Sequence, residues 1–246
     1  MPKVRFMKRL FVIFIMLFSF VGAHSQEIKR VDPSLGDIRT LLKSAGYELF
    51  SFDISSLRNE TYKISLVTRE YVNGELVKDS SSEDDFQFSI SFANRLMISD
   101  FPEEEQKKIL EGNMAYDADN DIYVLSERIS IGFLPPADSL RSFYLNVGNT
   151  GTFGGAISMK PLDAPGYEDT IKYETRPFKV DKIEIGGFTP LVMIGSFWYD
   201  SRYNIIRFCG ENELAKDSSP ILGFIPHYYI IGIKVQGPVP SEGRGR

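Results

Sequence analysis

The sequence predicts an all-β fold, an antiparallel β-sandwich of the jelly-roll or immunoglobulin kind, with one N-terminal helix and one short internal helix. Three observations predict it. Apolar and polar residues alternate over many short segments, Gly, Pro, Asn and Asp separate these segments, and only two stretches have a helical period. Alternation with a period of two turns one face of each strand to a core and the other to water, as in two packed antiparallel sheets.

The strands are predicted from this alternation. It is clearest in FQFSISF, residues 86–92, where aromatic and aliphatic side chains alternate with Gln and Ser. The same pattern predicts strands at 61–66, 129–133, 142–147, 182–185 and 230–235. Asn73-Gly74 in YVNGELV predicts a type I′ hairpin turn, because these residues adopt positive φ angles most readily. Residues 71–72 and 76–77 should therefore pair.

Two segments are predicted to be helical. Residues 33–45 place four apolar side chains on one helical face, namely Leu35, Ile38, Leu41 and Leu42. Gly46 follows this segment as a stop signal. The second helix is expected in DFPEEEQKKILEG, residues 100–112, where Pro102 suits the first helical position and three Glu complement the positive end of the helix dipole. These three carboxylates therefore need no catalytic explanation.

The first residues predict a secretory signal peptide, residues 1–25. Four basic residues precede an apolar run at 10–21, and small residues stand before Gln26, the expected start of the mature chain. The run is too short to cross a hydrocarbon core, which needs about 20 residues. The single cysteine, Cys209, is far from the cleavage point, so lipid attachment has no acceptor there. We expect a soluble exported protein, periplasmic or extracellular, without a membrane anchor after cleavage.

Composition predicts one ordinary core. The chain has 43% apolar and 13% aromatic residues and one cysteine, so an internal disulfide is excluded. We expect a single β-sandwich domain at 26–237 and a flexible tail at 238–246; a split near Gly112 is the alternative. Without the leader, 24 Lys and Arg stand against 33 Asp and Glu, a net charge of −9. Such an acidic chain is not expected to bind nucleic acid through the phosphate backbone.

Three aspartates in MAYDADNDIYV have the spacing of a calcium loop. Asp117, Asp119 and Asp121 would supply the first, third and fifth positions. The sixth position requires Gly and is Ile122, and the twelfth requires Glu and is Arg128. We therefore expect a tight turn before a strand, with a weak calcium site on the three aspartates as the alternative. No other cofactor is expected.

The sequence contains no catalytic signature. His24 leaves with the leader, so His227 is the only imidazole of the mature chain. A Cys209 and His227 pair would be a nucleophile and its base, but Cys209 lies in the apolar stretch IIRFCG, where a thiol packs as a small hydrophobe. The glycines of VGNTGTFGG lack the lysine of a phosphate-binding loop, and we interpret them as a flexible hairpin loop. No catalytic residue is assigned.

An aromatic cluster is the candidate ligand site. FWYDSRY combines amphipathic rings with charged neighbours, and such rings can stack on a sugar. The candidate residues are Trp198, Tyr199, Tyr203 and Tyr228 for stacking, with Asp200 and Arg202 as polar contacts. The alternative is that these rings pack in the core or along a sheet edge.

FWYDSRYNIIRFCGENEL and SSPILGFIPHYYIIGIKV, with the leader, resemble exported proteins of unknown function from Gram-negative gut anaerobes. The resemblance implies an envelope or extracellular setting and no catalytic residue. We therefore expect a binding or structural module of the cell envelope, with a glycan or another envelope protein as partner. One alternative is a glycan-acting hydrolase with paired carboxylates. The other is a surface protein-interaction subunit, for which HYYIIGIKV, residues 227–235, would be an apolar sheet edge.

Overall fold

The computed structural model describes residues 30, 32–82, 90–111, 116–117, 122–124, 126–208, 210, 212–215 and 219–238. The chain divides into two compact units, Met1–Arg39 and Thr40–Arg246. Several predicted features lie outside the described residues, namely the leader at 1–25, the strand residues 86–89, Asp119, Asp121 and Cys209.

Helix α2, Leu35–Ser44, confirms the predicted N-terminal helix. It starts at a reciprocal cap, in which the Ser34 N–H donates to Asp37 Oδ2 at 2.8 Å and the Asp37 N–H donates to Ser34 Oγ at 3.2 Å. Gly46, with φ of +87°, ends it in the left-handed conformation. No side chain of α2 is buried, so the apolar face of the helix is not core in the described part of the chain.

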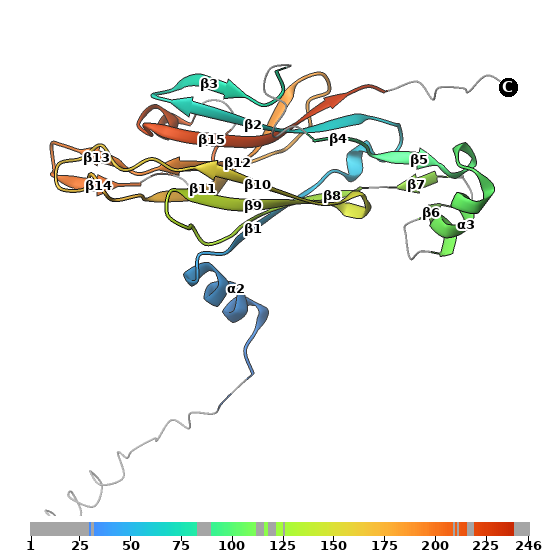
Figure 1. Ribbon diagram of the computed structural model, residues 1–246, viewed down its shortest axis with the longest axis horizontal. Coiled ribbons are helices and arrows are strands. Elements are labelled where there is room, and N and C mark those ends of the chain that lie inside the picture. Colours follow the sequence, from blue (N-terminus) through green and yellow to red (C-terminus); the bar gives the residue numbers. More distant parts are fainter. Residues whose placement is uncertain are drawn as a thin grey trace, which may run out of the picture. The chain divides into compact units, whose positions relative to one another are not determined.

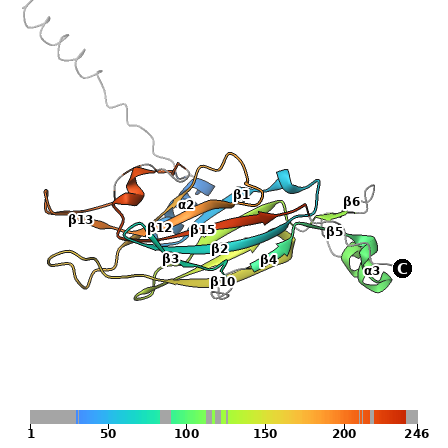
Figure 2. The same cartoon turned by 90° about the horizontal axis from the view of Figure 1, so that it is seen from above.

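Two antiparallel sheets form a sandwich, which confirms the predicted fold class (Figure 1). In spatial order, the first sheet contains β1 (Glu48–Asp53), β8 (Arg128–Phe133), β9 (Leu140–Val147) and β10 (Gly151–Ser158). The second contains β11 (Tyr173–Pro177), β12 (Phe188–Ser196), β15 (His227–Gln236) and β2 (Lys63–Val72), with β3 (Glu75–Asp79) and β4 (Ile90–Ala93) both beside β2. Figure 2 shows β12, β15 and β2 side by side, as their pairing requires.

Smaller elements complete the fold. A three-stranded sheet contains β5 (Arg95–Met97), β7 (Ile122–Val124) and β6 (Tyr116–Asp117), and a separate hairpin contains β13 (Trp198–Asp200) and β14 (Ile205–Arg207). Helix α3, Glu103–Glu111, confirms the second predicted helix, with Pro102 directly before it. The single 3₁₀ turns are η1 (Ser55–Leu57), η3 (Ile98–Asp100), η4 (Gly148–Thr150) and η5 (Pro220–Gly223). In Figure 1 the β13–β14 hairpin and α3 lie at opposite ends of the sandwich.

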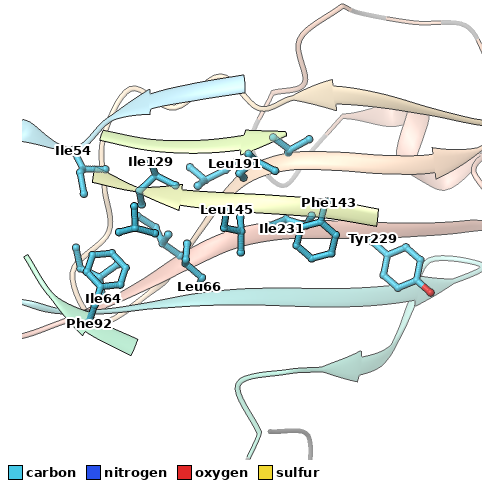
Figure 3. Packing of buried hydrophobic residues seen from close by; sticks show 14 of the residues in the cluster. Ile54, Ile64, Leu66, Phe92, Ile129, Phe143, Leu145, Leu191, Tyr229 and Ile231 are labelled. Carbon is cyan, nitrogen blue, oxygen red and sulfur yellow. The ribbon is translucent and has the colours of Figure 1, made fainter. Parts of the chain in front are cut away.

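The main core lies between the two sheets (Figure 3). Alternate residues of facing strands fill it, among them Ile64, Leu66, Ile129, Leu145, Leu191 and Ile231. A second cluster lies on the other side of the second sheet and includes Met193, Leu214, Ile225, Tyr228 and Ile230. Strand β15 contributes to both clusters, which explains why its sequence is continuously apolar.

Strand β15 is central and not an edge. It pairs with β12 on one side and with β2 along its whole length on the other, from Lys63 opposite Gln236 to Val72 opposite His227. The apolar segment 227–235 is therefore covered on both edges, which removes the edge that the protein-interaction alternative would have used.

The predicted Asn73-Gly74 turn is confirmed. Asn73 has φ of +50° and Gly74 has φ of +82°, and Tyr71 pairs with Leu76 across the turn. A register shift between Glu70 and Tyr71 interrupts the β2–β3 ladder below it. The turn residues therefore fix where this hairpin reverses.

Two sequence predictions need correction. Residues 182–185 form no strand: Ile185 makes a single parallel bridge to Val235, while Ile183 packs against the core. The glycine-rich segment does form a hairpin, but its loop is only the turn Gly148–Thr150, because Gly151–Ser158 is strand β10, paired with β9 throughout. A Cβ on Gly155 would lie 2.6 Å from the Phe143 ring, so this glycine makes room for an aromatic side chain of the paired strand.

Candidate functional site

The β13–β14 hairpin carries an exposed aromatic surface, which we name the aromatic hairpin and define as residues 197–208 with Phe224. Trp198 stacks on Phe224, with centroids 6.0 Å apart and an interplanar angle of 23°, and lies 6.2 Å from Phe208. Phe224 is 61% exposed and Tyr203 65% exposed. The hairpin therefore presents ring faces to solvent.

Polar contacts fix the turn of this hairpin. Asp200 Oδ2 lies 3.1 Å from Arg207 Nε, and Asp200 Oδ1 accepts the Arg202 N–H at 3.1 Å. The Tyr199 hydroxyl donates to Asn204 Oδ1 at 2.8 Å. Asp200 and Tyr199 thus hold the turn in place, while Arg202 is exposed beside it. Of the two predicted polar contacts, Arg202 is the one that the turn leaves at the surface.

Cations lie over three rings of the hairpin. Arg207 lies 4.8 Å from the centroid of Tyr203, and Lys172 lies 4.9 Å from that of Phe197. A third contact places Arg176 at 4.5 Å from the Phe208 centroid. A cation over a ring is attracted to its face, and such contacts help to fix the orientation of the ring. Tyr203 keeps most of its surface open although Arg207 covers part of it.

Tyr228 is separated from the other predicted residues. It is 4% exposed and stacks on Tyr71, with centroids 4.8 Å apart and an interplanar angle of 7°. Burial raises the pKa of its hydroxyl. A ring this buried has no free face for a sugar, so Tyr228 belongs to the second cluster, against which Trp198 packs. The structure brings the remaining five predicted residues together on one hairpin.

A buried hydrogen-bond chain joins three strands of the second sheet. His227 Nε2 lies 2.8 Å from Glu70 Oε1, and His227 Nδ1 lies 2.5 Å from the Tyr173 hydroxyl. The Lys160 N–H donates to the same hydroxyl at 2.9 Å, and Lys160 Nζ lies 3.9 Å from Glu70. We name Glu70, His227 and Tyr173 the buried chain. Both ring nitrogens of His227 are therefore engaged, and neither is left for the pairing with Cys209 that the sequence argued against.

Burial sets the protonation of this chain. Desolvation lowers the pKa of His227, and the hydrogen bond that it donates to Glu70 opposes this shift. Desolvation also raises the pKa of Tyr173 to about 12. With His227 neutral and Tyr173 protonated, Nε2–H donates to the Glu70 carboxylate and Nδ1 accepts the Tyr173 proton. This direction of donation satisfies both ring nitrogens of His227 and the Tyr173 hydroxyl, so we interpret the chain as a structural network.

Sequence reasoning missed this chain, although one signal pointed to it. Glu70 has the same parity along β2 as Ile64 and Leu66, which face the core. A carboxylate at a core-facing position needs a buried partner. A histidine is one side chain that can pair with a buried acid, and His227 is the only histidine of the predicted mature chain. His227 could therefore have been proposed as the partner of Glu70.

A second buried polar group connects the two sheets. Arg141 of β9 is 5% exposed and its Nη2 lies 2.8 Å from Glu48 Oε2 of β1. The Thr175 hydroxyl of β11 donates to the same carboxylate oxygen. Arg141 also donates to the carbonyl oxygens of Gly46 and Leu134. A charge held by this many partners ties the edge strand β1 to the second sheet.

The weak calcium site, the alternative to a tight turn, stays untested. Within the described ranges, no three His, Cys, Asp or Glu side chains come together as ligands. Of the proposed calcium ligands, Asp117 lies in β6 opposite Ile122, while Asp119 and Asp121 lie outside the described residues. The weak calcium site on these aspartates is neither supported nor tested by the fold.

Two carboxylates line one surface hollow of about 390 Å³, namely Asp53 and Glu127. Glu127 lies 3.3 Å from Arg58, and Asp53 accepts the Ser55 N–H at 2.7 Å. Hydrogen bonds from Ser55 lower the pKa of Asp53. A glycosidase acid requires the opposite shift, because it must carry a proton at neutral pH. The lowered pKa therefore argues against Asp53 as the acid of a glycosidase, whereas the nucleophile or base of such an enzyme is an ionised carboxylate.

Comparison with known proteins gives a family. Residues 17–237 match the model of a domain of unknown function (DUF5041). No curated protein and no solved structure matches the chain. In the part of the chain that the structure describes, no helix is long and apolar enough to span a membrane.

Proposed function

The chain belongs to the DUF5041 family, and we propose that it is an exported binding module of the cell envelope that holds a glycan on its aromatic hairpin. One observation carries the proposal: Tyr203 and Phe224 are both more than half exposed on a hairpin whose turn is fixed by polar contacts. Phe224 stacks on Trp198 of the same surface, and an exposed apolar patch, unlike a single exposed ring, marks a binding surface.

The chemistry of the hairpin suits a sugar. Ring faces such as those of Tyr203 and Phe224 can stack on the C–H face of a pyranose. Arg202 is exposed on the same hairpin and can donate hydrogen bonds to hydroxyl or carboxylate groups of the sugar. The leader, with its bases, apolar run and small residues before Gln26, supports export to the compartment where glycans are met. Binding without cleavage is favoured over hydrolysis because the sequence contains no catalytic signature and the exposed rings form the candidate surface.

Calorimetric titration tests the proposal. The mature chain from Gln26 is titrated with soluble polysaccharides and their oligosaccharides, and then Tyr203→Ala and Phe224→Ala are titrated with any glycan that binds. Loss of one stacking ring is expected to weaken binding about 5- to 10-fold. Tyr167→Ala is the matched control, because Tyr167 is an exposed tyrosine in the segment between β10 and β11.

Two outcomes overturn the proposal. In the first, no glycan of the panel binds the wild-type chain, which leaves the exposed rings to a protein partner. In the second, a glycan binds but Tyr203→Ala and Phe224→Ala bind it as tightly as Tyr167→Ala does, which places the glycan elsewhere.

A further inference from the structure

The space between the two sheets changes from apolar to polar toward one end. Along β2 the residues that face this space are first Ile64 and Leu66, and then Thr68 and Glu70 on the same face. Glu70 stands opposite Tyr229 of β15, whose ring packs in the main core. Figure 3 shows Tyr229 at one end of the labelled core side chains. Polar side chains therefore face the interior of the sandwich at this end.

A pocket of about 270 Å³ lies here, lined by β10 of the first sheet and by β2, β3 and β15 of the second. Its volume is close to the lower end for small-molecule sites, roughly 300 Å³. We name it the polar pocket; its lining includes Thr68, Glu70, Lys78, Ser80, Ile157 and Tyr229. Hydroxyl and charged groups thus share one pocket with an apolar side chain.

Strand pairing brings the polar side chains to one face. Lys78 stands opposite Glu70 in the register of β2 and β3, and the side chains of directly paired residues lie on the same face. Ser80 is held beside Thr68, because its N–H donates to the Thr68 carbonyl oxygen at 3.0 Å and its Oγ accepts the Thr68 N–H at 2.9 Å. The Glu70 side chain is 19% exposed, whereas that of His227 is 4% exposed. A ligand in the pocket can therefore reach the carboxylate but not the imidazole.

Several hydrogen-bonding groups of the pocket are unused in the described part of the chain. The Thr68 hydroxyl has no partner there, and the buried Ser80 hydroxyl accepts a bond there without donating one. The Tyr229 hydroxyl donates to the Ser158 carbonyl oxygen at 3.0 Å and can still accept. The Glu70 carboxylate has about four acceptor positions, of which the buried chain uses one. The pocket thus offers both donors and acceptors to a ligand.

The charges of the pocket, in contrast, are already engaged. Glu70 accepts from His227 and lies 3.9 Å from Lys160 Nζ, and Lys78 has a contact of its own. An anion in the pocket would meet Glu70 and a cation would meet Lys78, so a charge of either sign meets a like charge. A hydroxyl group both donates and accepts without a charge, so it matches what the pocket leaves unused.

We propose that the polar pocket binds a small uncharged polyol, of the size of one monosaccharide, with hydroxyl groups bonded to Thr68, Ser80 and Glu70 and a C–H face against Ile157. The pocket contains no residue of the aromatic hairpin, so this site goes beyond the proposed function and does not depend on it.

The mature chain from Gln26 is titrated with glucose, galactose, mannose, xylose and myo-inositol. Binding is followed by NMR of labelled Ile and Thr methyl groups, with the methyls of Ile157 and Thr68 as reporters. The tightest ligand is then compared with cyclohexanol, with a uronate and with serine, a zwitterion. It is expected to bind about 5- to 20-fold more tightly than each of the three, because these lack hydroxyl contacts or bring a charge to a like charge.

Variants locate the site. Thr68→Val removes one hydroxyl of the pocket at nearly constant shape and should weaken polyol binding about 5- to 10-fold, as read from Ile157. Thr61→Val is the matched control, because Thr61 is a half-buried threonine just before β2 and outside the lining. Glu70→Gln keeps an acceptor but loses the charge that strengthens its hydrogen bonds, and should weaken binding about 3- to 10-fold. Tyr203→Ala should bind the polyol as the wild type does, so that failure of the glycan proposal and of this one are distinguishable.

The proposal is overturned by any of three results. No polyol of the panel shifts the Ile157 and Thr68 methyls; cyclohexanol, the uronate or serine binds as tightly as the best polyol; or Thr68→Val binds it as tightly as Thr61→Val. Both threonine variants keep every backbone hydrogen bond, so the result does not depend on whether Glu70→Gln folds.

Discussion

The aromatic hairpin and the buried polar groups use polar and aromatic side chains in opposite ways. In the hairpin, Asp200 and Tyr199 contact residues within a few positions along the chain, and the rings they support face solvent. In the buried chain, Glu70 and His227 are 157 residues apart in sequence and His227 is 3% exposed. The first arrangement presents a surface; the second fixes the relative positions of strands.

Substitutions in these two regions should therefore change the free energy of unfolding by different amounts. A buried charge that loses its partner keeps its full desolvation cost, whereas an exposed ring that is removed loses only contacts that water can replace. Substitutions in the buried groups should therefore act on stability, and substitutions in the hairpin on binding.

The largest effect is expected for Arg141→Met. It leaves the Glu48 carboxylate without its cation at a place where little solvent reaches it, and should lower the free energy of unfolding by about 3–5 kcal/mol. Urea denaturation followed by circular dichroism measures it. Lys179→Met, at an exposed position beside β11, should change stability by less than about 0.5 kcal/mol. Equal stability of the two variants would show that β1 is held by packing alone.

A smaller loss is expected for His227→Phe. The variant keeps the apolar volume but leaves Glu70 and Tyr173 without their shared partner, which should cost about 1–3 kcal/mol in the same denaturation experiment. Glu70→Gln is the matched control, because the amide oxygen still accepts from Nε2–H and the loss should be smaller. If His227→Phe is as stable as the wild type, the buried chain contributes nothing to the fold.

The pH dependence should show a still smaller effect. Burial lowers the pKa of His227 in the folded chain. Below pH 6.5, the ordinary pKa of histidine, the imidazole therefore binds a proton in the unfolded chain before it does so in the folded chain. The contribution of His227 is therefore complete above pH 6.5 and is lost as the pH falls through the lowered pKa. Denaturation of the wild type and of His227→Phe between pH 7.5 and 5 measures it, and the wild type should lose more stability. Parallel pH profiles would contradict the buried neutral imidazole.

The sequence predicted what depends on neighbours along the chain. Period-two alternation predicted β8, β9 and β2, and Asn73-Gly74 predicted the turn between β2 and β3. Each of these features depends on only a few consecutive residues. The rings of 197–203 are likewise neighbours along the chain, and their role as a ligand site stays a prediction. Alternation failed at 182–185, where Ile183 packs on the core without strand pairing.

Contacts across long sequence distances were beyond this kind of reasoning. No local pattern shows that the Tyr173 hydroxyl meets His227, or that Phe224 stacks on Trp198, since each pair is brought together by strands or turns far apart in the chain. Gly155 was misread for a similar reason: its role is to lie under Phe143 of the paired strand, and only the strand register reveals that.

The smallest change in stability is expected for Tyr203→Ala. The ring is 65% exposed and its described partner, Arg207, keeps its contact with Asp200, so the free energy of unfolding should change by less than about 0.5 kcal/mol. Tyr71→Ala is the contrasting tyrosine variant, because removing Tyr71 uncovers the face of buried Tyr228 and should cost more. Denaturation of both variants decides the point. A stability loss for Tyr203→Ala equal to that for Tyr71→Ala would mean that the Tyr203 ring stabilises the fold. The contrast between exposed rings that bind a ligand and buried groups that stabilise the fold would then be wrong for Tyr203, the most exposed ring of the hairpin.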